Sequence, residues 1–237
     1  MSAISDFQNG YDSWESIIRE NRSIVQPTIG YTMSNQTDLF SDKSQEWDGN
    51  PVIQQLSANV SQAIIESVAL SEELTVMDFG AGTGLIAAAV APRVQKVIAV
   101  DVSESMLEQL SAKAYLRGRV EPICQDITEA PLNRQVDGIV SAMALHHVED
   151  TQKCLQTFAD HLSVGGFLAL ADLDSEDGTF HPEGIEGVFH HGFDREQLKS
   201  MMEKSGFANV AFSTAHTVQR APDAPTYPIF LMTAVKG

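Results

Sequence analysis

Apolar residues follow two different spacings along the chain from about residue 50 onward. A spacing of three to four residues is typical of helices with one buried face, and short continuous apolar runs are typical of strands buried on both faces. The helical spacing covers residues 51–68, 84–91, 104–116, 151–162 and 195–206. The apolar runs cover residues 74–80, 96–102, 120–126, 136–145, 165–173, 208–216 and 226–237.

The order of these elements predicts the fold class. Strands and helices alternate from residue 74 to residue 206, which predicts an α/β fold with a parallel sheet covered by helices on both faces. The last two strands have no helix between them, so we expect that pair to be antiparallel. The chain contains no internal repeat.

The first part of the chain has a different composition. Residues 1–49 are polar and rich in Ser, Asn, Gln and Asp, and only residues 13–21 have the spacing of a short amphipathic helix. We therefore predict two parts: an N-terminal extension over 1–49, flexible or acting as a lid, and one folded domain over 50–237.

Charge and composition exclude several classes of protein. The chain has 237 residues and a formal net charge of −17, so a phosphate backbone would be repelled and nucleic acid is not an expected partner. We interpret the basic cluster of Lys113, Arg117 and Arg119 as a solvated helix end. Cys124 and Cys154 lack a metal-binding spacing and are expected to be reduced and buried. Neither a secretory signal nor a membrane-spanning apolar run is seen, so we expect a cytoplasmic protein without membrane insertion.

The segment from Val76 to Val90 reads as a strand, a glycine-rich turn and a helix. Gly80, Gly82 and Gly84 allow the backbone to turn sharply and to approach a ligand closely. The G-x-G-x-G spacing differs from the G-x-G-x-x-G of dinucleotide-binding folds, whose third glycine would stand where this chain has Leu85. Asp78, two residues before the first glycine, favours a cationic ligand group over a pyrophosphate.

Two further acids end the next two strands. Asp101 lies 23 residues after Asp78, where a carboxylate accepts hydrogen bonds from both hydroxyls of a ribose. Asp126 ends the third strand, where it could accept from an adenine amino group while Ile127 packs on the ring. Each aspartate alone could be a cap or a turn residue. Three acids at successive strand ends beside a glycine loop favour a nucleoside ligand.

This set of motifs resembles the class I S-adenosylmethionine-dependent methyltransferases. The resemblance covers about residues 50–237 and rests on the order of five segments and on the closing antiparallel strand. It is closest to the small-molecule branch that includes the ubiquinone-biosynthesis methyltransferases. The segments are VMDFGAGTG, VIAVDVSESML, CQDI, VDGIVSAMALHHV and LSVGGFLALADL. The family fold is a Rossmann-like, doubly wound sheet of seven strands, mostly parallel with an antiparallel C-terminal strand.

The resemblance implies a cofactor, S-adenosyl-L-methionine, and a role for each matching position. The methionine moiety would lie against Asp78, the glycine loop and the backbone of residues 141–143. The ribose would lie against Asp101. The adenine would lie between Val102 and Met106, with its edge at Asp126 and Ile127. The implied cofactor-binding residues are Asp78, Gly80, Ala81, Gly82, Gly84, Asp101, Val102, Met106, Asp126, Ile127, Ala142 and Met143.

Histidines are the candidates for chemistry on the acceptor. Methyl transfer needs a general base only when the acceptor must lose a proton, and histidine is the common base near neutral pH. His146 follows the strand that borders the cofactor and could face either the pocket or the core, whereas the resemblance indicates a structural corner at His147. His181 and His191 lie in the long connection after the fifth strand. We predict His146, His181 and His191 as catalytic candidates.

The long connection, residues 172–198, begins at the carboxyl end of a strand, where α/β sheets bind ligands. It carries histidines, acids and phenylalanines, and we interpret it as the substrate-facing insertion. Although its His, Asp and Glu residues could in principle hold a metal, no metal-binding frame is present and we predict none. Asp150 and Asp194 have the positions of helix N-caps.

The sequence predicts a methyltransferase that acts on a small molecule at O, N, S or C, with an oligomeric state that it does not fix. Three alternatives stay open. One is a catalytically silent cofactor-binding or adaptor module. The second is a protein methyltransferase, since acidity disfavours RNA but not a basic protein. The third is an NAD-dependent oxidoreductase, against which the glycine spacing and the closing strand count.

Overall fold

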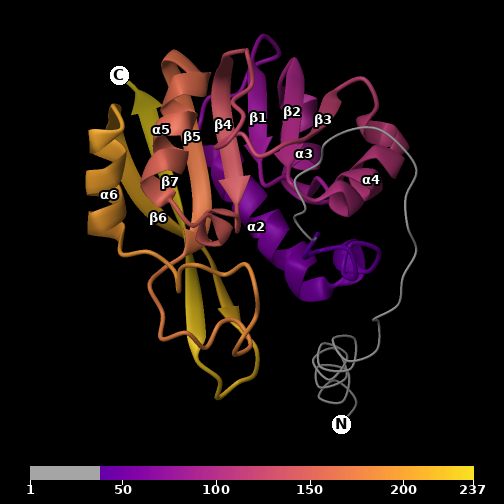
Figure 1. The fold of residues 1–237 in the computed structure, drawn as a ribbon, viewed down its shortest axis with the longest axis vertical. Helices are drawn as coiled ribbons and strands as arrows, with labels where there is room; N and C mark the ends of the chain where they lie inside the picture. Colours follow the sequence, from indigo (N-terminus) through magenta and orange to yellow (C-terminus); the bar gives the residue numbers. More distant parts are fainter. Residues whose placement is uncertain (1–37) are drawn as a thin grey trace. The chain divides into compact units, whose positions relative to one another are not determined.

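A computed structural model gives the fold and describes residues 38–237 (Figure 1). One seven-stranded sheet runs through this part of the chain in the order β3-β2-β1-β4-β5-β7-β6. Neighbouring strands from β3 to β5 are parallel, and β7 is antiparallel to both β5 and β6. The predicted α/β sheet with its antiparallel C-terminal strand is confirmed. The strands are β1 (Thr75–Phe79), β2 (Lys96–Asp101), β3 (Val120–Cys124), β4 (Val136–Ala142), β5 (Leu162–Leu173), β6 (Phe207–Gln219) and β7 (Thr226–Lys236).

Four of the five α-helices in the described residues begin after a capping side chain, and α3 (Leu85–Val90) begins after Gly84 without one. The side chains of Asn50, Ser103, Asp150 and Asp194 each accept a hydrogen bond from a backbone N–H in the first turn of the helix that follows. The α-helices are α2 (Pro51–Ser67), α3 (Leu85–Val90), α4 (Glu104–Ala112), α5 (Thr151–His161) and α6 (Arg195–Lys204). Short 3₁₀ turns are η1 (Trp47–Gly49), η2 (Ala91–Arg93), η3 (Ala114–Leu116) and η4 (Leu145–His147).

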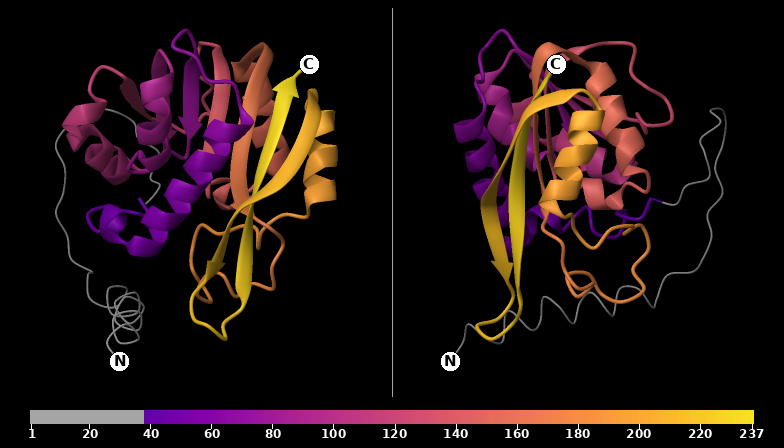
Figure 2. Two further views of the ribbon diagram at one scale, coloured as in Figure 1. Left: turned by 180° about the vertical axis from the view of Figure 1, so that it is seen from behind. Right: turned by 90° about the vertical axis from the view of Figure 1, so that its left-hand side faces the viewer.

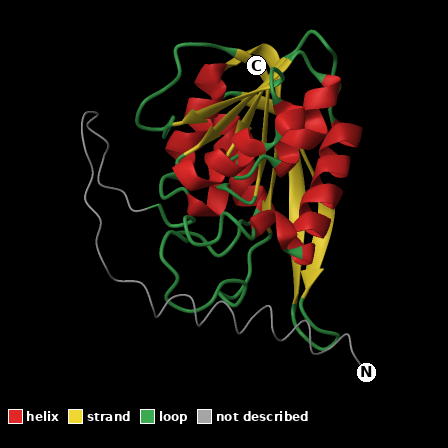
Figure 3. Cartoon of the chain, turned by 90° about the vertical axis from the view of Figure 1, so that its right-hand side faces the viewer, coloured by secondary structure: helices red, strands yellow, loops and turns green. Residues whose placement is uncertain are grey.

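Helices cover both faces of the sheet, as Figure 3 shows for the strands in yellow and the helices in red. Alternate residues of each strand serve opposite layers: in β2, Val97 packs with the α2–α3 layer and Ile98 with the α5 layer. Fully buried side chains on the second side include Phe158 and Phe230. Truncating one of them would cost about 3–5 kcal/mol, because a cavity adds to the lost transfer free energy.

Two details differ from the predicted elements, whereas the helix predicted over 84–91 does end before Pro92. It ends as α3 at Val90, and the proline lies in the 3₁₀ turn η2 that follows. The strand β5 starts at Leu162 rather than at residue 165, since Leu162 pairs with Val136 across a register shift. Cys124 is exposed, so only Cys154 is the buried thiol that we expected.

Residues 38–50 form part of the same compact unit as the rest of the described chain. The predicted helix over 13–21 and most of the predicted extension lie outside the described residues. Within the described part, the helices are all too short or too polar to cross a bilayer.

The sheet reverses its strand order between β1 and β4, which is where open α/β sheets bind ligands, beyond the carboxyl ends of the strands. The long β5–α6 connection and the β6–β7 hairpin project beyond that same edge, in orange and yellow (Figures 1 and 2). The connection from 174 to 193 closes on itself, with Asp174 and Phe193 paired side by side.

Candidate active site

The glycine loop after β1 forms the floor of the site. All three glycines have a positive φ, a backbone conformation that residues with a side chain rarely adopt. A Cβ on Gly80 would come within 2.3 Å of the Ala144 Cβ, and one on Gly84 within 2.7 Å of Leu110. A Cβ on Gly82 would meet nothing within 4 Å. Gly80 and Gly84 therefore serve close packing, whereas Gly82 faces open space that a ligand can fill.

Asp78, just before this loop, is a buried carboxyl without a full set of partners. It is 1% exposed, and its Oδ2 atom has no hydrogen-bond partner. Burial, with a contribution from the nearby Asp101 carboxylate, raises the pKa of Asp78 to about 8. A buried polar atom without a partner is costly, so this site favours a ligand that brings a hydrogen-bond donor or a positive charge.

Asp101 ends β2 and faces the same loop. Its carboxylate accepts hydrogen bonds from the backbone N–H of Gly82 at 2.7 Å and of Ser103 at 2.8 Å. Burial raises the pKa of this carboxyl above its usual range, although the two hydrogen bonds act to lower it. The neighbouring Val102 side chain is 58% exposed, while Met106 is buried. The end of β2 thus offers an acceptor and an apolar surface side by side.

The predicted adenine positions lie at the end of β3. The Asp126 carboxylate accepts from the backbone and the hydroxyl of Thr128, at 2.8 and 2.7 Å. Ile127 is completely buried in the core that also holds Met77 and Phe158. Its side chain therefore belongs to the core and does not offer the face that we expected to pack on an adenine ring. A ligand at this strand end could reach the polar groups of Asp126 instead.

The end of β4 supplies the wall of the site next to the glycine loop. Met143 has a φ of 56°, which is rare for a residue with a side chain, and its N–H donates to Ala171 at 2.9 Å. The Ser141 hydroxyl donates to the carbonyl of Phe79. Strained backbone of this kind persists where the surrounding structure fixes it, and often at functional sites. Ala142 and Met143 stand at that corner.

A strap formed by residues 38–50 crosses the same edge of the sheet. At its start, Asp38 accepts from Ser103 and Ser105, with hydroxyl distances of 3.0 and 2.7 Å. At its other end, Asp48 accepts from the Thr83 hydroxyl and pairs with Lys113, each at 2.5 Å. Between them, the Phe40 ring meets His147 edge-on. The strap thus joins the glycine loop, α4 and the histidine corner.

His146 is the most completely buried of the candidate catalytic residues, at 1% exposure. Its Nδ1 lies 2.6 Å from Oδ1 of Asp172, which ends β5 and is also fully buried. The backbone N–H of His146 donates to the other oxygen of that carboxylate. Burial opposes ionisation of Asp172, but the electrostatic interaction and the hydrogen bonds with His146 outweigh it and lower the pKa of Asp172.

The long connection brings His181 to His146, with 3.2 Å between their Nε2 atoms. Burial, then His146, His147 and Arg220, lower the pKa of His181 to about 3. His147 lies on the other side, and its Nδ1 donates to the carbonyl of Gly187 at 2.6 Å. Burial, followed by the electrostatic interaction with His146, lowers the pKa of His147 to about 4. Both rings are therefore neutral at physiological pH.

His191 lies apart from the His146–His181 pair. Its side chain is 62% exposed and its Nδ1 is 3.6 Å from Glu176, whose other oxygen accepts three backbone N–H groups of the loop. The structure thus brings two of the three candidate histidines together. His190 bonds Val148 and Thr151 at the start of α5.

Aromatic and basic side chains hold the connection against the β6–β7 hairpin. The guanidinium of Arg220 lies 4.9 Å from the Phe180 ring and 5.3 Å from the Tyr227 ring, and it donates to the carbonyls of Thr179 and Phe180. The Phe180 ring meets His181 edge-on. These contacts fix His181 against the site.

Two functional features escaped the sequence reasoning. The pairing of Asp172 with His146 follows from the β4–β5 register, in which Ala142 lies beside Ala171, so both side chains emerge at the same edge. The strap contacts of Asp38 and Asp48 join residues far apart in the chain and have no local signal. Within residues 38–237, no group of three or more His, Cys, Asp or Glu side chains is placed to hold a metal.

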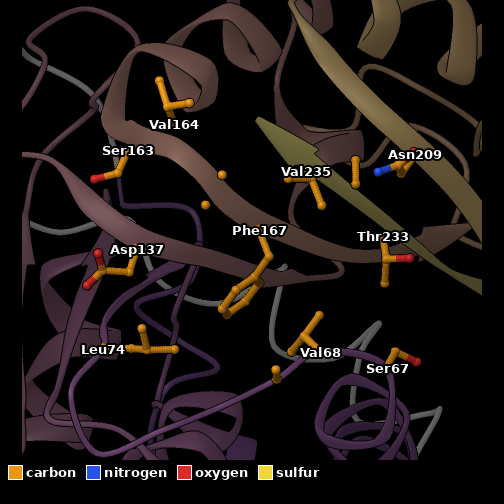
Figure 4. Close-up of a pocket in the computed structure, with 14 residues that line it drawn as sticks. Ser67, Val68, Leu74, Asp137, Ser163, Val164, Phe167, Asn209, Thr233 and Val235 are labelled. Atoms are coloured by element: carbon orange, nitrogen blue, oxygen red, sulfur yellow. The ribbon is translucent and has the colours of Figure 1, made fainter. Parts of the chain in front are cut away.

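A pocket lies at the opposite, amino-terminal edge of the strands (Figure 4). Phe167, Leu74 and Val68 line it together with Asp137. The Asp137 carboxylate there accepts from the backbone of Thr75 at 2.8 Å. None of the predicted site residues lines this pocket, so it is separate from the histidine corner and the glycine loop.

Comparison with known proteins finds similarity to methyltransferases. A family described as a methyltransferase domain matches residues 76–166. An uncharacterized methyltransferase of Schizosaccharomyces pombe is 28% identical over 165 residues, 62% of this chain and 56% of that protein. An O-methyltransferase of Pyrenophora dematioidea is 26% identical over 209 residues, 78% of each chain. The chain spans little more than half the length of the first curated relatives it matches.

Solved structures share the fold. The N-methyltransferase NodS of Bradyrhizobium japonicum, in complex with S-adenosyl-L-homocysteine, superposes with a TM-score of 0.63 at 16% identity. The match covers 84% of this chain and 95% of NodS.

Proposed function

We propose that the chain transfers a methyl group from S-adenosyl-L-methionine to a small molecule, as the match of residues 76–166 to a methyltransferase domain supports. The observation that carries this proposal is the combination of the buried Asp78 carboxyl, whose Oδ2 has no hydrogen-bond partner, with an open space at Gly82. These two features lie in one loop, beyond the strands at which the sheet order reverses.

The residues present fit S-adenosyl-L-methionine. Its ammonium group would supply the partner that Asp78 lacks, and its ribose hydroxyls would donate to Asp101. Val102 offers an exposed apolar surface for the adenine, beside Asp126. When bound, the cofactor supplies a methyl group on a sulfonium sulfur, which leaves as a neutral thioether. The protein's task is to align the acceptor and exclude water, and the strap over residues 38–50 is placed to do the second.

On the acceptor side we propose that His181 and His146 act together in moving the acceptor's proton. His191 is the weaker candidate because it is exposed and contacts Glu176 instead. The related proteins include enzymes named for both O- and N-methylation, so their names leave the acceptor atom open. Membership of the ubiquinone-biosynthesis branch likewise stays a prediction.

Calorimetric titration of the full chain with S-adenosyl-L-methionine tests the proposal. We expect one cofactor per chain, and formation of S-adenosyl-L-homocysteine when acceptors are supplied. No binding at millimolar cofactor would exclude the proposal, and tight binding of NADH in its place would favour an oxidoreductase. Binding without turnover on any acceptor would favour the silent module.

Cofactor binding should release protons at neutral pH. The pKa of Asp78 is about 8 in the empty site, so this carboxyl is mostly protonated at pH 7. An ammonium partner favours the carboxylate and lowers that pKa, so the proton leaves on binding. Affinity should therefore rise with pH from 6 to 8.

Calorimetry in buffers of different ionisation enthalpy measures this release. We expect close to one proton per cofactor at pH 7 for the wild type and a much smaller release for Asp78→Asn. An equal release from both proteins would show that another group gives up the proton.

A further inference from the structure

We propose that the methyl acceptor is a phenolic hydroxyl, and that His181 takes its proton and passes it to His146, which Asp172 holds as the final proton acceptor. The inference deepens the proposed function and rests on it. Its basis is a continuous line of contacts from the end of β5 to the long connection: Asp172 Oδ1 to His146 Nδ1 at 2.6 Å, and His146 Nε2 to His181 Nε2 at 3.2 Å.

The partners of each ring fix where the protons lie. An ionised carboxylate only accepts, so His146 must carry its proton on Nδ1, facing Asp172. The relay as proposed starts with both rings uncharged, so that the lone pair of His146 is on Nε2 and His181 donates from its own Nε2. The lone pair of His181 is therefore on Nδ1. This is the free basic atom of the pair.

Exposure determines the order of the two rings. His146 is 1% exposed, so it offers almost no surface to a substrate, whereas His181 is only partly buried. An acceptor can thus reach His181 but not His146. His181 touches the substrate and is the catalytic residue, His146 receives its proton, and Asp172 is a positioning residue.

The proton balance explains why the chain needs such a relay. Methylation of a neutral hydroxyl by a sulfonium releases one proton, because the positive charge passes to the acceptor. The acceptor O–H bond breaks and its proton joins Nδ1 of His181. His181 gives its Nε2 proton to Nε2 of His146, and the resulting imidazolium is stabilised by the Asp172 carboxylate.

The charged groups around the relay direct the proton inward. Arg220 disfavours a lasting positive charge on His181, while Asp172 favours one on His146. His181 thus acts as a conduit, and the charge rests where a buried carboxylate compensates it.

The surroundings of His181 favour an aromatic acceptor. Phe180 meets His181 edge-on, and Phe40 of the strap meets His147 in the same way. Aromatic rings pack well against such surfaces. A phenol also has an acidity that a histidine relay can serve, whereas a carboxylic acid is already ionised at neutral pH.

Nitrogen-15 NMR of the histidine side chains tests the relay without cofactor or substrate. We expect His146 in the Nδ1–H form and His181 in the Nε2–H form, with a strongly hydrogen-bonded Nδ1 proton on His146. The opposite tautomer on either ring would overturn the relay. Cofactor titration on the same sample separates this failure from failure of the proposed function.

Turnover with matched acceptors tests the chemistry. At pH 8, 4-methylphenol keeps its proton, 4-nitrophenol is largely ionised, and 4-methylaniline is the nitrogen counterpart of the first. We expect the wild type to methylate both phenols. His181→Gln and Asp172→Asn should lower the rate with 4-methylphenol by roughly a hundredfold or more and the rate with 4-nitrophenol much less, with cofactor affinity unchanged within about twofold.

The control variant is His216→Gln, because His216 bonds Asn59 on α2 and has no contact with the relay. It should behave as the wild type with both phenols. Equal losses for the two phenols in His181→Gln would overturn the role in proton transfer. Methylation of 4-methylaniline alone, or of none of the three compounds, would overturn the assignment of the acceptor.

Discussion

Replacing Asp101 by alanine should weaken S-adenosyl-L-methionine binding by about 1.5 to 3 kcal/mol, or roughly ten- to a hundredfold. The carboxylate ends β2 beside Gly82 and Val102, where it can accept from the ribose hydroxyls. Hydrogen bonds to a charged group exceed those between neutral groups in strength, so their loss has a large effect. Calorimetric titration of both proteins with the cofactor measures the change.

The variant also loses the bonds to the N–H groups of Gly82 and Ser103, so its fold needs a separate check. Asp101→Asn keeps the shape and one acceptor, and it should show a smaller loss of affinity. Circular dichroism and thermal unfolding establish that both variants fold. Unchanged affinity in folded Asp101→Ala would mean that the cofactor does not lie at the end of β2.

Replacing Gly82 by alanine should reduce cofactor affinity by a hundredfold or more while leaving the empty protein folded. A Cβ at this position meets no atom of the protein within 4 Å, so it would project into the space that the cofactor is proposed to fill. The φ of 53° adds a conformational cost of about 1–2 kcal/mol to folding. The expected result is a modest loss of thermal stability together with a large loss of binding.

Gly118→Ala is the matched control for this variant. Gly118 also has positive φ, at 81°, and its Cβ would likewise meet nothing within 4 Å, but it lies before β3. We expect a similar loss of stability and a normal cofactor affinity. Gly80→Ala should instead lower stability further, because its Cβ would clash with Ala144. Equal affinities in Gly82→Ala and Gly118→Ala would argue against a cofactor at the glycine loop.

Most of the fold was predictable from the sequence because its signals are local. Continuous apolar runs marked strands buried on both faces, and Asp150 and Asp194 marked two of the helix starts. The boundaries that were wrong depended on pairing between strands: Leu162 belongs to β5 because it lies beside Val136, a partner 26 positions earlier in the chain. Local periodicity carries no information on such partners.

The part of the site that lies within one short motif could be predicted from the sequence. Asp78 and the glycines share a single turn, so their proximity follows from sequence alone. The relay could not be derived in the same way, because His181 reaches His146 only through a loop that folds back on the sheet. The exposure of His191 depends on that loop path as well, which sequence spacing does not reveal.

Hydrogen-exchange mass spectrometry with and without S-adenosyl-L-homocysteine tests the location of the cofactor site most directly. The proposed site predicts slower exchange on binding in the loop from Asp78 to Gly84, at the end of β2 and in the strap over residues 38–50. The pocket around Phe167, at the other edge of the sheet, should be unaffected. Protection at that pocket, with none at the glycine loop, would contradict the proposed site.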